Sequence, residues 1–267
     1  MSSRTSVTVY GENTMQFLGI AGPAGSGKDS AADYIVKTYG GEKIALADPM
    51  KFFLEDVFGF TNRQLWGPSQ FRNAPDKRYE GSMRPGALHV ARTRFEEHAP
   101  SWLLGVLPHF THAQRVASAE ALRLWFEDFA GQASLTPRYG LQTLGTEWGR
   151  AQDPSIWLLY AERDAKAREL KGYVLISDCR FLNEAKFLRE RDAKLLEIIR
   201  PGTDGSAAMA AGVAAHPSEM ERVRHQAEFK TYVTHTITND DTLETFYRRL
   251  SEALVGGQHG AFQDHRT

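Results

Sequence analysis

The feature that most constrains this chain is the heptapeptide GPAGSGK, which spans Gly22 to Lys28. It matches the pattern G-x-x-x-x-G-K, and it lies between an apolar run typical of a buried strand, Met15 to Gly22, and a helical pattern that begins near Lys28. Glycines allow such a loop to curl with its backbone N–H groups facing inward, and the following helix N-terminus adds partial positive charge. The motif therefore predicts a phosphate-binding loop, with Lys28 as the cation for the β- and γ-phosphates of a nucleotide.

The loop departs from the general motif at one position. Asp29 follows Lys28 where the motif has Ser or Thr as a Mg²⁺ ligand, and the hydroxyl comes one residue later, at Ser30. Either Ser30 or the Asp29 carboxylate would then face the metal, directly or through water, or Asp29 would only stabilise the first helical turn. The residues expected to bind ATP are Gly22, Ala24, Gly25, Ser26, Gly27, Lys28, Asp29 and Ser30.

Strands and helices alternate along the chain around this loop. After the first strand, short apolar runs predict strands over 42–47, 173–177, 194–199 and 235–239. Helices are expected from Asp48 as N-cap to Gly59, from Asp153 to near Gly172, from an Asn183 cap to about Arg191, and across Leu243 to Leu250. Such alternation is typical of an α/β fold with a parallel sheet of about five strands.

Two segments do not follow the alternation. Gly81 to Leu135 holds one amphipathic stretch, Ala113 to Ala130, within loop-like sequence, and we interpret it as a helical insert or small subdomain. Arg200 to Pro217 is rich in Gly and Ala, which indicates a mobile loop. We therefore expect an N-terminal extension over 1–14, a P-loop domain over 15–256 with an insert at about 81–135, and a flexible tail over 257–267.

The composition excludes several function classes. The chain has 267 residues, and its 32 Lys and Arg balance 33 Asp and Glu, so bulk attraction to nucleic acid or to an anionic membrane is not expected. Cys179 is the single cysteine, which excludes an internal disulfide and a cysteine-based zinc site. No apolar run reaches the roughly 18 residues of a membrane span, and the first residues lack the apolar core of a secretory signal. We expect a cytoplasmic protein.

A second candidate group follows the third predicted strand, in the sequence SDCRFLNE. A carboxylate at the carboxyl end of a strand near a phosphate loop, such as Asp178, is where Mg²⁺ or its waters are held in phosphoryl-transferring folds. Arg180 would neutralise charge on the transferring group, and Glu184 follows closely. The alternative is a surface ion pair between Asp178 and Arg180 that does no chemistry.

Phosphoryl transfer to an acceptor other than water requires a second anion site. Its candidates are Asp48 and Lys51 after the second strand, Arg72, Lys77 and Arg78 in WGPSQFRNAPDKRY, and Arg138 in PRYGLQTLGTEWGR. Each alone is more often a solvated charge, but we expect at least one or two of the basic side chains to bind the acceptor phosphate. For the base, Gln142 offers hydrogen bonds and Trp148 or Trp157 offers stacking, unless the two rings pack in the core.

Several segments, taken in order, resemble the deoxynucleoside monophosphate kinase family of tailed bacteriophages. They are GIAGPAGSGKDSAADY, ALADPMKFFLEDVFG, WGPSQFRN, LQTLGTEWGR, ISDCRFLNEA, IIRPG and HPSE. The Lys-Asp-Ser ending of the phosphate loop is similar to what that family and phosphomevalonate kinases carry. The resemblance covers most of the chain, and residues 1–14, much of 81–135 and the tail after about Gly256 lie outside it.

The resemblance implies a nucleoside-monophosphate-kinase-like three-layer sandwich and Mg²⁺-dependent transfer of the ATP γ-phosphoryl group to a dNMP, by a homodimer. Lys28 would contact phosphates, while Arg72 and Arg180 would surround the transferring group. Gly145, Thr146 and Trp157 would line the dNMP pocket, and Asp178 and Glu184 would serve the acceptor or metal side. Two alternatives stay open: a kinase for dephospho-coenzyme A or phosphomevalonate, and a nucleotide sensor without an acceptor reaction.

Overall fold

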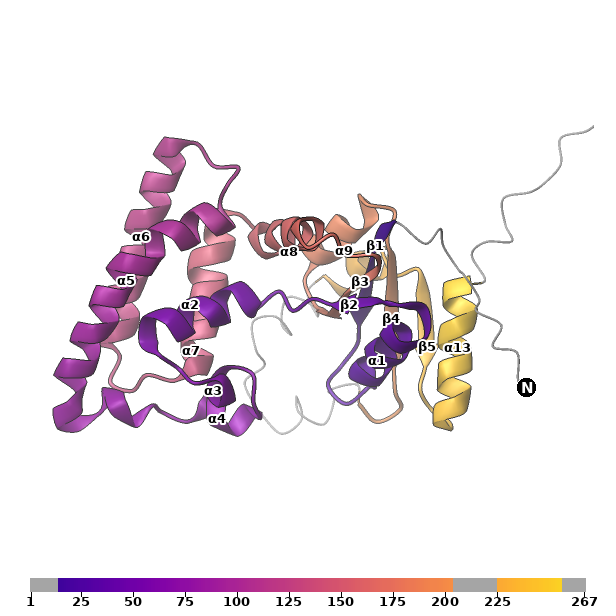
Figure 1. Ribbon diagram of the computed structural model, residues 1–267. Coiled ribbons are helices and arrows are strands. Elements are labelled where there is room, and N and C mark those ends of the chain that lie inside the picture. The colour runs from indigo at the N-terminus through magenta and orange to yellow at the C-terminus, as the bar shows by residue number, and fades with distance from the viewer. Residues whose placement is uncertain (1–13, 204–224, 256–267) are drawn as a thin grey trace, which may run out of the picture. The chain divides into compact units, whose positions relative to one another are not determined.

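The computed structural model describes residues 14–203 and 225–255, which divide into two compact units (Figure 1). Unit 1 combines the chain up to Ala45 with the chain from Asp164 onward, and unit 2 is Leu46–Arg163. Unit 2 is thus larger than the insert expected at about 81–135. Most of the loop predicted over Arg200 to Pro217 lies outside the described residues, as do almost all of the predicted N-terminal extension and the tail.

Unit 1 contains a five-stranded sheet in the order β2-β3-β1-β4-β5. Every paired neighbour in it runs parallel. Because β1 is central, the loop that follows it emerges at the carboxyl edge between the ends of β3 and β4, where open α/β sheets bind ligands. The strands are β1 Met15–Ala21, β2 Gly41–Lys43, β3 Gly172–Cys179, β4 Lys194–Ile199 and β5 His235–Thr238.

Helices cover both faces of this sheet, so unit 1 has three layers. Leu18 and Ile20 of β1 share a buried cluster with α1 (Lys28–Tyr39) and α13 (Leu243–Val255). On the opposite face, Phe17 meets Phe187 of α9 (Leu182–Arg189), with ring centroids 5.5 Å apart. This alternation is the period of two that a strand imposes on its side chains. The short helix α12 (Gln226–Lys230) precedes β5. The predicted α/β class and parallel sheet are confirmed.

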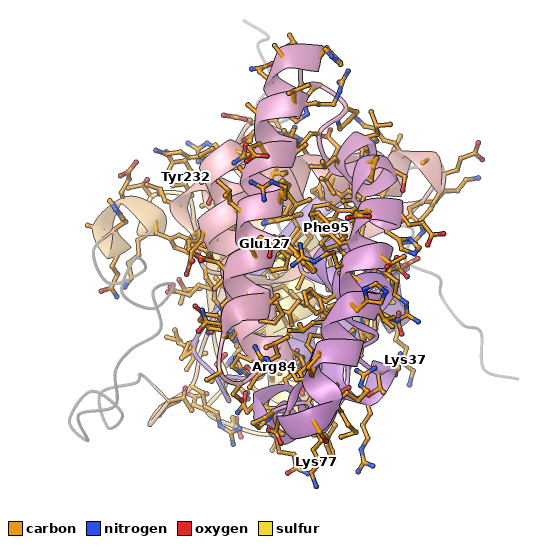
Figure 2. The ribbon with its side chains drawn as sticks, turned by 90° about the vertical axis from the view of Figure 1, so that its left-hand side faces the viewer. Lys37, Lys77, Arg84, Phe95, Glu127 and Tyr232 are labelled. Atoms are coloured by element: carbon orange, nitrogen blue, oxygen red, sulfur yellow. The ribbon has the colours of Figure 1, made fainter. Side chains whose placement is uncertain are left out.

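Unit 2 is helical throughout, with its own core of mostly aromatic and aliphatic side chains. Figure 2 faces its two long helices, where Phe95 of one packs on Phe126 of the other at 4.6 Å between centroids. No helix in the described part of the chain is both long and apolar enough to cross a membrane. The helices that begin in this unit are α2 Asp48–Phe58, α3 Asn62–Leu65, α4 Ser69–Asn73, α5 Arg84–Val106, α6 His112–Gly131, α7 Pro137–Gln142 and α8 Ile156–Ala167, with short turns η1 Lys77–Tyr79 and η2 Gly81–Met83 and a π-helix η3 Thr143–Arg150. The residues of α8 from Asp164 onward belong to unit 1.

The largest correction concerns α5, which the sequence patterns assign to loop-like structure. Its buried residues Ala91, Phe95, Ala99 and Leu103 recur every four positions and cover one helical face. The prolines and glycines within this stretch are typical of loops, so the helical periodicity is not evident from the sequence. Pro85 lies in the first turn, where its missing N–H is tolerated, and only Pro100 interrupts the helix interior. By contrast, α6 begins and ends within one residue of the predicted stretch from Ala113 to Ala130, and Thr111 caps it.

Several boundaries also differ from prediction, and α8 spans Ile156–Ala167 rather than Asp153 to near Gly172. β2 ends at Lys43 rather than near Ala47, because the chain leaves the sheet after Ile44 donates its N–H to the Leu175 carbonyl and then turns into α2 at Asp48. Asp48 is the first residue of α2 and not its N-cap, because its carboxylate is bound by other side chains of unit 2. Asn183 lies inside α9, whose N-cap is Phe181, and the Glu184 side chain accepts from the backbone N–H groups of Phe181 and Arg180 just before the helix.

Candidate active site

The phosphate-loop motif forms a tight turn between β1 and α1. Gly22, Gly25 and Gly27 have positive φ angles of 148°, 76° and 104°. A Cβ on Gly22 would lie 2.3 Å from the carbonyl oxygen of Ile198, and one on Gly27 would lie 2.6 Å from the side-chain nitrogen of Asn239. At these two positions the loop therefore requires glycine, both for its backbone conformation and for close approach of neighbouring atoms.

Lys28 begins α1, and its side chain folds back over the loop. Its Nζ donates hydrogen bonds to the carbonyl oxygens of Gly22 at 2.8 Å and of Pro23 at 2.9 Å. The same Nζ lies 3.7 Å from Oδ1 of Asp178. The ammonium group therefore lies beside the positive end of the α1 dipole, and an anion in the loop would be attracted by both.

The loop also contains polar groups that a phosphate would satisfy. The Ser26 hydroxyl is buried and has no hydrogen-bond partner among the described residues. Within the same described ranges, the N–H of Gly27 makes no hydrogen bond. A buried hydroxyl without a partner, such as that of Ser26, costs free energy, and phosphate oxygens would accept from both groups. The motif's chemistry therefore fits a polyphosphate. Ala24, Asp29 and Ser30 are exposed.

At the end of the neighbouring strand β3, Asp178 and Arg180 form an ion pair. Nε and Nη2 of Arg180 lie 2.8 Å and 2.7 Å from Oδ2 of Asp178. Since Oδ1 of the same carboxylate faces Lys28, Asp178 bridges two cations. Both side chains of the Arg180 pair are about half exposed, at 40% and 49%, so the pair adds little stability. The structure thus brings Lys28, Asp178 and Arg180 together at one edge of the sheet.

Glu184, which the family resemblance assigns to the acceptor or metal side, is buried at the start of α9. The residue is only 2% exposed, and its Oε2 accepts hydrogen bonds from the backbone N–H groups of Arg180 at 2.6 Å and Phe181 at 3.0 Å. A carboxylate in this position binds the N–H of the N-cap residue and of the residue before it, and is favoured by the helix dipole. Glu184 therefore fixes the backbone that carries Arg180.

Oxygen ligands for a metal are sparse at this edge. Ser30 and Asp178 are both exposed and offer the hydroxyl and carboxylate oxygens that Mg²⁺ prefers. No group of three or more His, Cys, Asp or Glu side chains arranged for a metal ion occurs in the described ranges. This donor set fits an ion that keeps several waters and is held mainly by substrate phosphates, and not a cation bound in a protein cage.

In unit 2, Asp48 and Lys51 lie in the first turn of α2 and contact each other. Lys51 is 9% exposed, and its Nζ donates to Oδ1 of Asp48 at 2.9 Å. Trp66 donates its indole N–H to the same oxygen at 3.2 Å, and the Lys51 ammonium lies 5.4 Å from the Trp66 ring centroid. The buried ammonium is thus held by a carboxylate and an aromatic face. The sequence patterns did not single out Trp66.

Arg72 and Arg138 come together elsewhere in unit 2. Burial and the nearby positive charge of Arg138 lower the pKa of Arg72 from its usual value. Arg72 donates to the carbonyl oxygen of Leu65 at 3.3 Å, and Arg138 donates to the side-chain oxygen of Asn73. Neither guanidinium has a carboxylate partner among the described residues. Two like charges held close without an acidic neighbour favour binding of an anion.

The segment predicted to read a base is largely a packing element. Trp148 and Trp157 are 2% and 3% exposed, and their indole N–H groups are used by the carbonyls of Ser118 and Gly145. Stacking on a base would require an open ring face, so the expectation of stacking is corrected in favour of the core alternative. Gly145 is buried against Met50, Gln142 is half-buried, and Thr146 is exposed.

One residue at the phosphate loop was missed by the sequence patterns. Asn239 directly follows β5, and its side chain donates to the carbonyl oxygen of Ser26 at 2.8 Å. The sequence patterns place Asn239 only as the last residue of the strand predicted over 235–239. Its place at the carboxyl end of a parallel strand was the available signal, because such ends share the edge where the loop lies.

Comparison with known proteins gives one relative in sequence. No protein-family model matches the chain. The chain is 26% identical over 238 residues to a protein of Acanthamoeba polyphaga mimivirus named "Putative deoxynucleotide monophosphate kinase". The aligned region covers 88% of this chain and 94% of the viral protein.

Comparison with solved structures gives a more distant similarity. A dephospho-CoA kinase from Campylobacter jejuni aligns with 91% of this chain and 100% of its own, at 12% identity and a TM-score of 0.36. A similarity of this degree supports no conclusion about this chain.

Proposed function

We propose that the chain is a deoxynucleoside monophosphate kinase, which transfers the γ-phosphoryl group of ATP to a dNMP and yields ADP and dNDP. The observation that carries this proposal is the loop over Gly22 to Lys28, whose inward-facing donors lie beside Lys28 and the Asp178–Arg180 pair. Such a loop binds phosphates through its backbone, and the neighbouring cations supply the charge that phosphoryl transfer needs.

The donor side would work through position and charge. Lys28 would exchange its hydrogen bonds with Gly22 and Pro23 for the β- and γ-phosphate oxygens, which carry full negative charge. Arg180 would leave Asp178 partly or wholly to neutralise charge on the transferring group. A phosphate oxygen of the acceptor forms the new bond to the γ-phosphorus as the bond from that phosphorus to the departing ADP oxygen breaks. The loose transition state requires no general base.

The acceptor phosphate would bind at the two adjacent arginines of unit 2. Arg72 and Arg138 have fixed donors and no carboxylate to compete with a ligand among the described residues. A nucleoside monophosphate brings the dianion that two guanidinium groups recognise best. Asp48 and Lys51 are the second candidate pair for this substrate. The Lys51 ammonium is less available to a phosphate, because it is buried and already contacts the Asp48 carboxylate.

The base and sugar would be contacted by the accessible residues of the segment around η3. Gln142 offers an amide, and Thr146 offers an exposed hydroxyl next to the closely packed Gly145. The role of Trp157 would be indirect, because its indole N–H holds the Gly145 carbonyl at 3.0 Å. A site that hydrogen-bonds a base can discriminate strongly against a base that lacks the matching group.

Mg²⁺ would accompany the ATP phosphates and neutralise part of their charge. The side chains that would hold it, directly or through water, are those of Ser30 and Asp178, whose oxygen donors suit the ion. Asp178 would then exchange contacts with Lys28 and Arg180 for a contact with the metal or its waters.

The resemblance to bacteriophage deoxynucleoside monophosphate kinases and the name of the mimivirus relative both support a nucleotide as acceptor. The homodimer remains part of this proposal. The alternatives differ in acceptor, and this makes them separable by experiment.

The test is an acceptor panel with γ-labelled ATP and Mg²⁺. It contains dTMP, dGMP, dCMP, dAMP, the four ribonucleoside monophosphates, dephospho-coenzyme A and phosphomevalonate. We expect labelled diphosphate from at least one dNMP, with a higher kcat/KM than from any non-nucleotide. Label that enters only dephospho-coenzyme A or phosphomevalonate would contradict the proposed substrate. ATP binding without transfer to any acceptor would favour a nucleotide sensor.

A further inference from the structure

A side chain from a distant part of the sequence holds the phosphate loop. Asn239 lies directly after β5, more than two hundred residues from the loop, and its backbone N–H donates to the Ile199 carbonyl at 2.8 Å. Its side-chain Nδ2 donates to the carbonyl oxygen of Ser26, also at 2.8 Å. Only the nitrogen of an amide side chain can donate to a carbonyl, so the contact fixes the orientation of the Asn239 amide.

The contact also fixes the peptide between Ser26 and Gly27. The described chain contains no cis peptide bond, so the carbonyl and the N–H of this planar group point in opposite directions. With the Ser26 carbonyl turned toward Asn239, the Gly27 N–H points away from it. That N–H has no acceptor among the described residues. It is therefore held as a free donor on the opposite side of the peptide.

The surroundings leave little freedom for this peptide to rotate. Gly27 has a φ of 104°, and a Cβ on it would lie 2.6 Å from Nδ2 of Asn239 and 3.7 Å from the buried ring of Phe246. Asn239 thus contacts the loop on the side of the Ser26 carbonyl, and α1 begins at Lys28, directly after Gly27. A peptide flip would remove the Ser26 carbonyl from its donor and turn the Gly27 N–H toward a side-chain N–H group.

We propose that Asn239 is a positioning residue, which orients the Gly27 N–H toward the polyphosphate of the bound nucleotide. This inference rests on the nucleotide-binding part of the proposed function, and not on the identity of the acceptor. Preorganised donors are effective because they need no rearrangement when the ligand arrives. Asn239 itself contacts the loop backbone, so its effect is confined to binding of the phosphate tail.

Three variants test the role. Asn239→Leu keeps the size of the side chain but has no donor. Asn239→Asp replaces the donor with an oxygen that repels the Ser26 carbonyl. Asp240→Asn is the matched control, because it makes the reverse exchange of carboxylate and amide at the next residue, whose side chain binds Arg249 rather than the loop. The probes are ATP and inorganic tripolyphosphate, with affinities measured by calorimetry on the full chain in the absence of acceptor.

We expect Asn239→Leu to bind both probes about tenfold more weakly than the wild type, as the loss of one well-oriented donor to a charged group predicts. Asn239→Asp should bind them more weakly still, and Asp240→Asn should match the wild type. In a coupled enzymatic assay of diphosphate formation, KM for ATP should rise in Asn239→Leu while KM for dNMP and the melting temperature remain close to wild type. A purely structural role would lower the melting temperature without separating the two KM values.

The outcomes distinguish this inference from the proposed function. Wild-type affinity of Asn239→Leu for tripolyphosphate, or equal weakening by Asp240→Asn, would overturn the positioning role even if dNMP phosphorylation is observed. Weakened probe binding by the two Asn239 variants alone supports the role, whichever acceptor the enzyme uses. If Asn239→Leu does not fold, Asn239→Asp decides, and wild-type affinity in that variant overturns the inference. A wild-type protein that binds neither probe would overturn both proposals.

Discussion

The two units use glycine and aromatic residues in contrasting ways. In unit 1, glycines remove side chains so that the backbone can approach neighbouring atoms and present its N–H groups, as at Gly22 and Gly27. In unit 2, large rings fill the interior, and even the indole N–H groups of Trp148 and Trp157 are used to hold backbone carbonyls. The loop of unit 1 thus presents backbone donors, whereas the aromatic residues of unit 2 form its core.

The basic side chains of the two units also differ in whether they have a carboxylate partner. Lys28 and Arg180 of unit 1 share the Asp178 carboxylate, so each cation already has a partner that an anion could replace. Arg72 and Arg138 of unit 2 repel one another and have no acidic partner in the described ranges. The comparison suggests two kinds of anion site. In unit 1 the cations are held in ion pairs, and in unit 2 two arginines carry charge that no carboxylate neutralises among the described residues.

The largest expected effect is at the loop. Lys28→Ala should lower kcat/KM for diphosphate formation by about 10⁴-fold, because the charge that meets the transferring phosphoryl group is removed. The measurement is the coupled diphosphate assay, with circular dichroism to verify the fold. Lys37→Ala is the matched control, since it removes an exposed lysine from the last turn of the same helix. Unchanged turnover of Lys28→Ala would reject its role.

A large effect on stability, and not on the chemistry, is expected at Trp157. Replacement by Ala should lower the free energy of unfolding by about 3–5 kcal/mol, because it leaves a cavity in the core of unit 2. Urea denaturation measures this change. Trp157→Phe should cost about 1 kcal/mol for the lost hydrogen bond to Gly145. Wild-type stability of the Ala variant with a raised KM would instead indicate a stacking role.

A smaller effect, confined to unit 2, is expected at Asp76. Burial alone would raise the pKa of this carboxyl, but hydrogen bonds from Arg78 and Gln64 outweigh it, so the pKa lies below its usual value. A lowered folded-state pKa adds stability that is present above the unfolded-state value and is lost as the pH falls through the folded-state value.

Asp76→Asn should therefore lower the free energy of unfolding at pH 7 by about 2 kcal/mol. The difference from wild type should shrink in urea titrations at progressively more acidic pH, while ATP affinity at pH 7 stays unchanged. A stability difference between wild type and Asp76→Asn that stays constant down to strongly acidic pH would contradict the lowered pKa of Asp76.

The smallest effect is expected at the uncompensated charges. Arg72→Ala should raise KM for dNMP about tenfold, as expected for loss of one charge-assisted hydrogen bond to phosphate, and leave ATP affinity unchanged. Arg63→Ala is the control, because Arg63 lies over the Phe71 ring near α4 and has no predicted role. Equal KM values for Arg72→Ala and wild type would remove Arg72 from the acceptor site.

The parts of unit 1 that local sequence determines could be predicted well. The loop and the two elements beside it were predicted within a residue, and β4 matches the predicted range 194–199. Each depends on a contiguous pattern, such as glycines next to a short apolar run. Strand ends set by the next element were less predictable: β2 ends early because the chain turns into α2.

The functional roles of side chains were less accessible to sequence reasoning. Whether Trp148 packs or stacks depends on what surrounds it, and neighbours such as Ser118 lie far away in the sequence. Asn239 was missed for the same reason, since its partner is Ser26. Glu184 differs because its partners are only three and four residues away, and a carboxylate at the third position of a helix is a readable cap.

The central claim is that the loop from Gly22 to Lys28 binds the triphosphate of ATP through its backbone N–H groups. The most direct measurement is a titration of ¹⁵N-labelled protein with ATP, followed by amide NMR. We predict that the largest shifts fall on Gly25, Ser26, Gly27 and Lys28, and that tripolyphosphate shifts the same amides. Saturable ATP binding that leaves these amides unchanged, with the largest shifts elsewhere in the chain, would contradict the account.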